Sequence, residues 1–242
     1  MLRPLLTISI AALGIGLAGA DGTPTPKTAG GPTFELTSSG NVVWNIVDDD
    51  REERRRVLRQ GEPGTYISEI LHARDSALAR WRDRKENDPL LVWIQPASGV
   101  EDWSHRFVYE VHSAFVAWDT LKLRLRFEIV ADSAKAHVHV VWIDRFNEPI
   151  SGRTRWARDE NYWITDASIM LAVHHRTGET LEDDAMHAMA LHEIGHLLGL
   201  DHTKDATSVM APKVRVRSLS DADRATARLL YSLPAGPVSD SR

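Results

Sequence analysis

The chain has 242 residues, of which 43% are hydrophobic and 26% are charged, a composition typical of a globular protein with room for one domain and additional N-terminal sequence. A formal charge of −5 and an isoelectric point near 6.1 leave no basic surface field to hold nucleic acid, so we expect no nucleic-acid partner. The absence of cysteine excludes disulfide bonds and the attachment of a lipid to a thiol.

The first 20 residues have the organisation of an export signal. Arg3 gives a positive start, residues 5–17 form a short apolar segment, and the Ala-Gly-Ala of residues 18–20 suits a signal-peptidase site. The apolar segment is shorter than the roughly 20 residues that span a bilayer. We therefore expect a signal peptide at residues 1–20 and a secreted or periplasmic protein without a stable membrane span. The alternative is an uncleaved N-terminal anchor.

Residues 21–60 begin with a stretch rich in Pro, Gly and Thr and predict a flexible leader or a short pro-segment. Within them, apolar runs on either side of a turn-like Ser-Ser-Gly-Asn suggest a hairpin at residues 34–47. The charged run 48–56 indicates a solvated surface or a linker. Residues 61–88 predict a helix and a linker, with the helix running from about residue 66 to residue 84 on an apolar stripe.

Residues 89–233 alternate between short apolar runs and amphipathic segments, which predict the strands and helices of one domain. The stretch 147–162 is polar, and residues 234–242 are expected to be a disordered tail. Ser220 and Asp223 have the spacing of a capping box at the start of the last helix. The predicted strands are residues 90–95, 121–130, 137–143 and 167–173, and the predicted helices are residues 103–118, 182–200 and 221–231.

The helix at 182–200 carries the motif His-Glu-Ile-Gly-His at residues 192–196. His192 and His196 lie one turn apart on the same helical face, so their imidazoles can bind one metal ion, and Glu193 can reach a water on that ion. Gly199 can adopt the left-handed conformation that ends a helix, which lets the chain return His202 as a third ligand. Three protein ligands and one open position are typical of a catalytic zinc site, so we expect one Zn²⁺.

The run HEIGHLLGLDH resembles the extended HExxHxxGxxH motif of the metzincin zinc endopeptidases. The Ser-Val-Met-Ala-Pro of residues 208–212 is similar to their Met-turn, in which Met210 would lie beneath the metal. Within the metzincins the chain most resembles the matrixins, because Thr203 follows the third histidine. Pro212 stands where the astacins and serralysins have a tyrosine ligand. The resemblance covers roughly residues 89–233.

This resemblance implies an α+β, zincin-like catalytic domain at residues 89–233. A mixed, mostly parallel twisted sheet would pack on two long helices, and a small C-terminal subdomain would end in a helix. It also implies a metalloendopeptidase that acts on protein or peptide substrates, with Glu193 as general base, and we expect a monomer. In the family the substrate lies along the edge strand of the sheet, which we expect near residues 150–156. A requirement for Ca²⁺ stays open.

The resemblance also suggests the walls of a substrate pocket. In matrixins the residue four positions before the first zinc histidine helps to set the depth of the pocket for the side chain after the scissile bond. Here that residue is Ala188, which is too small to fill a pocket. The outer wall would come from the segment after the Met-turn, with Pro212 at its start and Lys213 and Arg215 at the mouth. A deep, mainly apolar pocket is therefore expected.

Two features of many matrixins have no counterpart in the sequence. No pattern of histidines for a second, structural zinc precedes the helix at 182–200, and latency through a propeptide cysteine is impossible without a cysteine. We interpret five further histidines as non-catalytic: His137, His139, His174, His175 and His187.

Two other functions remain open on the sequence alone. One is a zinc-dependent peptide-binding module without catalysis, against which the presence of Glu193 argues. The other is an HExxH enzyme outside the metzincins that uses a distant glutamate as third ligand, against which His202 and Met210 argue.

Overall fold

The computed structural model describes residues 34–36, 42–44, 46–74 and 76–238, which include the whole of the predicted catalytic domain. The predicted signal peptide lies outside these residues. Within the described part of the chain, no helix combines the length and the apolar character needed to cross a membrane.

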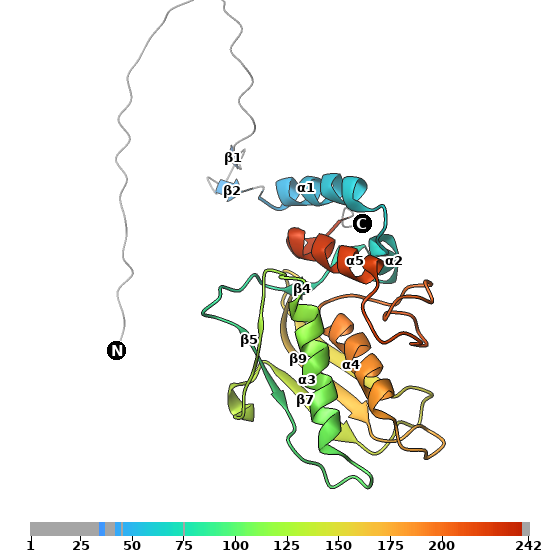
Figure 1. The fold of residues 1–242 in the computed structure, drawn as a ribbon. Coiled ribbons are helices and arrows are strands. Elements are labelled where there is room, and N and C mark those ends of the chain that lie inside the picture. Colours follow the sequence, from blue (N-terminus) through green and yellow to red (C-terminus); the bar gives the residue numbers. More distant parts are fainter. Residues whose placement is uncertain (1–33, 37–41, 45, 75, 239–242) are drawn as a thin grey trace, which may run out of the picture.

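A six-stranded sheet forms the centre of the molecule (Figure 1). Its order is β4-β9-β7-β5-β6 with parallel neighbours, and β8 pairs antiparallel with β9. In β7 the side chains of Val138, Val140 and Trp142 are buried and those between are half-buried, as the alternating sequence predicts. The expected α+β class with a mostly parallel sheet is therefore confirmed. The strands are β4 (Arg80–Trp81), β5 (Leu90–Ile94), β6 (Phe127–Ile129), β7 (Val138–Ile143), β8 (Gly152–Arg158) and β9 (Trp163–Ala172).

Two long helices, α3 (His105–Asp119) and α4 (Asp183–Leu197), lie side by side against the sheet (Figure 1). The backbone N–H of Arg106 donates to the Ser104 hydroxyl, which caps the start of α3. The indole of Trp118 donates to the carbonyl of Leu191 at 3.0 Å and joins the two helices inside the core. The prediction of two long helices is thus confirmed.

Helix α5 (Asp221–Ser232) begins with the predicted capping box of Ser220 and Asp223. Its buried residues, among them Leu230 and Tyr231, belong to the same hydrophobic cluster as the sheet and the other helices. A separate C-terminal subdomain therefore stays a prediction.

The N-terminal segment differs most from the expectation. The hairpin is present as β1 (Phe34–Leu36) and β2 (Val42–Trp44), but the charged run expected as a linker lies in helix α1 (Ile46–Gly61). One face of this helix is buried: Leu58 is in the core, and Arg54 donates to the carbonyls of Ala235 and Pro237. The prediction of a flexible leader is therefore wrong for residues 46–60, because the charged run lies in a helix with one buried face, and the alternative of a short pro-segment stays a prediction.

The helix expected at residues 66–84 is also wrong in its second half. Helix α2 (Ile67–Ala73) is short, Ser76 has a φ of 59°, and the chain continues as β3 (Ala77–Leu78) and β4. All five residues from 77 to 81 are buried, which suits an extended chain between two layers better than one stripe of a helix. Strand β3 pairs with β10 (Gly236–Pro237), so the expected tail at 234–242 is wrong as far as residue 237.

Two boundaries inside residues 89–233 also differ. The strand expected at 121–130 is reduced to β6, because the chain turns at Lys122, which has a φ of 51°. The single-turn helix η1 (Ser133–Lys135) follows β6. The polar stretch 147–162 contains β8, which among the described residues pairs with β9 alone and lies at the edge of the sheet, where the substrate-binding strand was expected.

Candidate active site

Helix α4 and the turn that follows it bring the three predicted histidines together. His192 and His196 lie one turn apart on α4, which ends at Leu197 with Leu198 as its C-cap. Gly199 has a φ of 98°, and its Cα approaches the backbone carbonyl of Ala79 so closely that an added methyl group would overlap it. Only glycine meets both conditions, and the chain then turns back to present His202.

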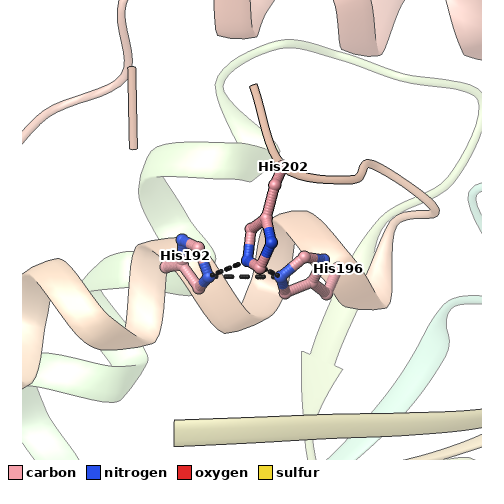
Figure 2. A group of neighbouring side chains, drawn as sticks. All are labelled: His192, His196 and His202. Atoms are coloured by element: carbon pink, nitrogen blue, oxygen red, sulfur yellow. Dashed lines mark hydrogen bonds between the residues drawn. The ribbon is translucent and has the colours of Figure 1, made fainter. Parts of the chain in front are cut away.

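The Nε2 atoms of the three histidines converge on one point (Figure 2). The separations are 3.1 Å between His192 and His196, 3.2 Å between His196 and His202, and 3.3 Å between His192 and His202. Tetrahedral zinc at roughly 2.0–2.1 Å from each nitrogen requires ligand nitrogens about 3.3–3.4 Å apart. The donor set therefore fits zinc, and it is the one such group of three ligands in the described part of the chain.

The other ring nitrogens determine which atoms face the metal position. Nδ1 of His192 donates to the carbonyl of Val209 at 2.6 Å, and Nδ1 of His196 donates to the carbonyl of Leu200 at 3.1 Å. A carbonyl only accepts, so each Nδ1 carries the proton and each Nε2 keeps its lone pair for a metal. Burial lowers the pKa of both histidines, that of His196 to about 3, so both rings are neutral near pH 7.

Glu193 is held by the edge strand β8. Its side chain is 4% exposed, and the Thr154 hydroxyl lies 2.6 Å from Oε2 and 2.9 Å from the Glu193 carbonyl. A Cβ at Gly152 would lie 2.5 Å from Oε1, so glycine is needed there to make room for the carboxylate. Burial raises the pKa of Glu193 to about 7, although the hydrogen bond from Thr154 opposes the rise. Sequence reasoning placed the substrate-binding edge strand here but missed the contacts of Thr154 and Gly152 with Glu193.

Met210, the residue of the predicted Met-turn, packs against helix α4. Its side chain is fully buried, and a methyl group added at Gly195 on α4 would overlap its sulfur. The turn is anchored by Asp223, which accepts hydrogen bonds from the Ser208 hydroxyl at 2.5 Å and from the backbone N–H of Val209 at 3.1 Å. The sequence suggested only a capping role for Asp223, whose carboxylate also fixes the turn that orients His192.

A cavity of about 460 Å³ opens beside the three histidines and Glu193. Of the four predicted pocket residues, Ala188, Pro212 and Lys213 line it. Arg215 is exposed and is not among the lining residues, whereas Val214 is, so the place of Arg215 at the mouth stays a prediction. Lining residues that the sequence did not indicate come from β8 and the residue before it, from the segment between β9 and α4, and from α4: Ser151, Arg153, His175, Leu181, Ala185 and Met189.

Residues 98–232 match the sequence profile of the peptidase M10 family, described as matrixin, and the match covers more than half of the chain. The chain belongs to the matrixin family. A curated relative, "Metalloendoproteinase 1" from Glycine max, is 33% identical over 89 residues. The alignment covers 35% of this chain and 27% of the relative, so the chain spans little more than a quarter of the relative's length. Membership of this family suggests a zinc metalloendopeptidase. The matched residues begin after β5, so the elements from β1 to β5 lie before them.

The other histidines of this matrixin have contacts of their own. His174 lies between Asp144 and Asp102, with its Nδ1 2.7 Å from the first carboxylate and its Nε2 3.3 Å from the second. His137 accepts from the backbone N–H of Leu91, His139 contacts the carbonyl of Ser133, and His187 contacts Glu110. None of them belongs to a group of three possible ligands among the described residues. Their interpretation as non-catalytic remains a prediction.

Proposed function

We propose that this chain is an exported zinc metalloendopeptidase that cleaves internal bonds of protein or peptide substrates. The observation that carries the proposal is the convergence of three histidine Nε2 atoms, 3.1–3.3 Å apart, in the cavity that the Glu193 carboxylate also lines. Three lone pairs at this distance repel one another unless a cation lies between them. Zinc held by three neutral imidazoles would supply an acidified water and polarise a peptide carbonyl.

In the proposed mechanism the protein residues hold and move one proton. His192, His196 and His202 hold the metal, and Glu193 takes a proton from the attacking water at a carboxylate oxygen. Glu193 then passes the proton to the departing amine. The raised pKa of Glu193 favours accepting the proton, and the carboxylate would be ionised at rest when a cation is held by the histidines nearby. The hydrogen bond from Thr154 fixes one carboxylate oxygen and leaves the other for the water.

The substrate would bind along β8. Within the described residues this strand pairs only with β9, and Gly152 to Thr154 line the cavity, so an extended peptide can add to its free edge. The cavity next to Glu193 has apolar walls at Leu181, Ala185, Ala188 and Met189. We therefore infer a preference for a bulky apolar residue after the scissile bond. Burying a leucine-sized side chain contributes roughly 1.5–3 kcal/mol, which corresponds to at least about a tenfold preference.

Peptide cleavage by the purified chain tests the proposal. We expect the zinc-loaded protein to cleave internal peptide bonds of a casein-type substrate. It should lose this activity when a chelator is added and regain it when zinc is restored. A protein that binds zinc and peptides without cleavage would instead be the binding module considered above. A chain without stoichiometric zinc binding would contradict both functions. N-terminal sequencing of the exported protein would test the predicted cleavage after residue 20.

A further inference from the structure

Arg74 follows helix α2 and lies outside the residues that match the matrixin family. Its side chain is 17% exposed and reaches the loop that carries the third histidine. Nη1 donates to the carbonyl of Gly199 at 2.9 Å, Nη2 to the carbonyl of Leu200 at 3.0 Å, and Nε to Oδ2 of Asp201 at 3.1 Å. One guanidinium therefore binds three consecutive residues directly after the metal-binding helix.

The acceptors of Arg74 are the same groups that orient two of the histidines. The Leu200 carbonyl that accepts from Arg74 also accepts from Nδ1 of His196, at 3.1 Å. The carboxylate of Asp201 accepts from Arg74 through Oδ2 and from the backbone N–H of His202 through Oδ1, at 2.7 Å. Arg74 is thus connected to both predicted ligands, His196 and His202, through acceptors that it shares with them. It touches neither imidazole.

The same guanidinium ties this loop to the edge strand. Its central carbon lies 5.0 Å from the ring centre of Trp156 in β8, two residues after Thr154, which holds Glu193. Both carbonyls lie just after helix α4, beyond the regular hydrogen bonds of the helix, and Leu200 is fully buried, so Arg74 supplies donors that the helix itself does not. Only the planar fork of arginine supplies three directed donors and a face for stacking, whereas lysine offers a point charge.

We propose that Arg74 is a positioning residue for the metal site, so that the segment before the family domain completes the active site. This inference rests on the proposed zinc function. It predicts that loss of the arginine fork loosens the Leu200 carbonyl and the Asp201 carboxylate, and with them the orientation of His196 and His202. Changes in such partners of metal ligands typically weaken metal binding about 10–100-fold.

The test uses the full chain with Arg74→Lys and Arg74→Ala. Zinc affinity is measured by competition with a chromophoric chelator, and ligand geometry by the visible absorption of the Co²⁺-substituted protein. We expect both variants to bind zinc about 10–100-fold more weakly and to show a shifted cobalt spectrum. Ethylguanidinium should restore part of the affinity of Arg74→Ala but not that of Arg74→Lys. The matched control is Arg82→Ala, since Arg82 has a 62% exposed side chain and pairs with Asp159 away from the loop.

The outcomes separate this inference from the proposed function. If the unmodified chain binds no zinc, the proposed function fails. If it binds zinc and Arg74→Lys binds within threefold with an unchanged cobalt spectrum, the role of Arg74 is refuted. An equal loss in Arg82→Ala would also refute it. Should circular dichroism show that both Arg74 variants are unfolded, Asp201→Asn decides, because it keeps an acceptor for the N–H of His202 and removes the charge that Arg74 binds. Unchanged zinc affinity in that variant would overturn the proposal.

Discussion

The metal-binding helix with its turn and the segment from α1 to β4 contribute to the same site in different ways. Residues 192–202 carry all three histidines and Glu193 within one helix and one turn, and their spacing alone predicts how they meet. Residues 46–81 contribute no ligand, and their sequence suggested a linker and one long helix. Yet Arg74 and Ala79 from this segment contact the turn that presents His202. Ligands are thus specified locally, whereas their support comes from distant sequence.

The largest effect is expected for a substitution in the metal-binding helix. Glu193→Gln should lower kcat by about 10²–10⁴-fold, because the amide cannot accept the proton from the water. Zinc content and thermal stability should stay close to those of the unmodified protein, since Glu193 is not a ligand. Turnover and zinc content measured on one preparation check this. Glu160→Gln, at an exposed position, serves as the control. A Glu193→Gln protein that retains most of its activity would rule out the assigned base.

Substrate selection should also follow from one residue of the metal-binding helix. In the unmodified protein, peptides with Leu after the scissile bond should be cleaved at least about tenfold faster than those with Ala. Ala188→Leu shortens the cavity and should remove most of this preference while peptides with small residues are still cleaved. The measurement is kcat/KM over a peptide series varied at that one position. Ala134→Leu, at an exposed site outside the residues that line the cavity, should leave the preference for Leu over Ala unchanged.

A substitution in helix α1, within the segment from α1 to β4, should change the stability of the protein rather than its catalytic activity. Arg54→Ala removes buried donors to the carbonyls of Ala235 and Pro237 and should lower the free energy of unfolding by about 1.5–3 kcal/mol. Arg56→Ala is the matched control, because this neighbour on α1 makes exposed contacts with Glu53 and Gln60 and should show no resolvable change. Urea unfolding of the zinc-free proteins gives both values. Equal unfolding midpoints would mean that α1 does not stabilise the domain.

The smallest effect is a pH dependence at His174. Burial tends to lower the pKa of His174, but its hydrogen bonds to Asp102 and Asp144 outweigh burial and raise it, while Arg145 also binds Asp144. Because the pKa is higher in the folded state, the stabilisation is fully present below the ordinary value of about 6.5 and is lost as pH rises through the raised value. The difference in urea midpoint between the unmodified protein and His174→Gln, both with chelator, should therefore be larger near about pH 5.5 than near about pH 9. A difference that grows with pH would reverse the assignment.

The sequence was sufficient for the parts of the site that depend on short spacings. The histidine pair, the turn at Gly199, His202 and Met210 all lie within 19 residues, and the resemblance that this short stretch carries implied the α+β class. It was not sufficient for Thr154, which lies 39 residues from Glu193, or for Arg74, which lies 127 residues from Asp201. Nothing in the local pattern of a charged or hydroxyl residue shows which distant group it will meet. The same limit explains α1 and the sequence after α2, where charged side chains obscured buried faces.

The contact of α1 with residues 235–238 has a consequence for the order in which the chain can fold. Arg54 and Arg55 donate to carbonyls that lie 181–183 residues further along the chain. Closing so long a loop is entropically costly and typically late in folding. Helix α1 is therefore synthesised long before residues 235–238, and its contacts with them can form only after the intervening residues have been made. During that interval its packed face, including Leu58, is exposed to the exit tunnel, to chaperones and to proteases.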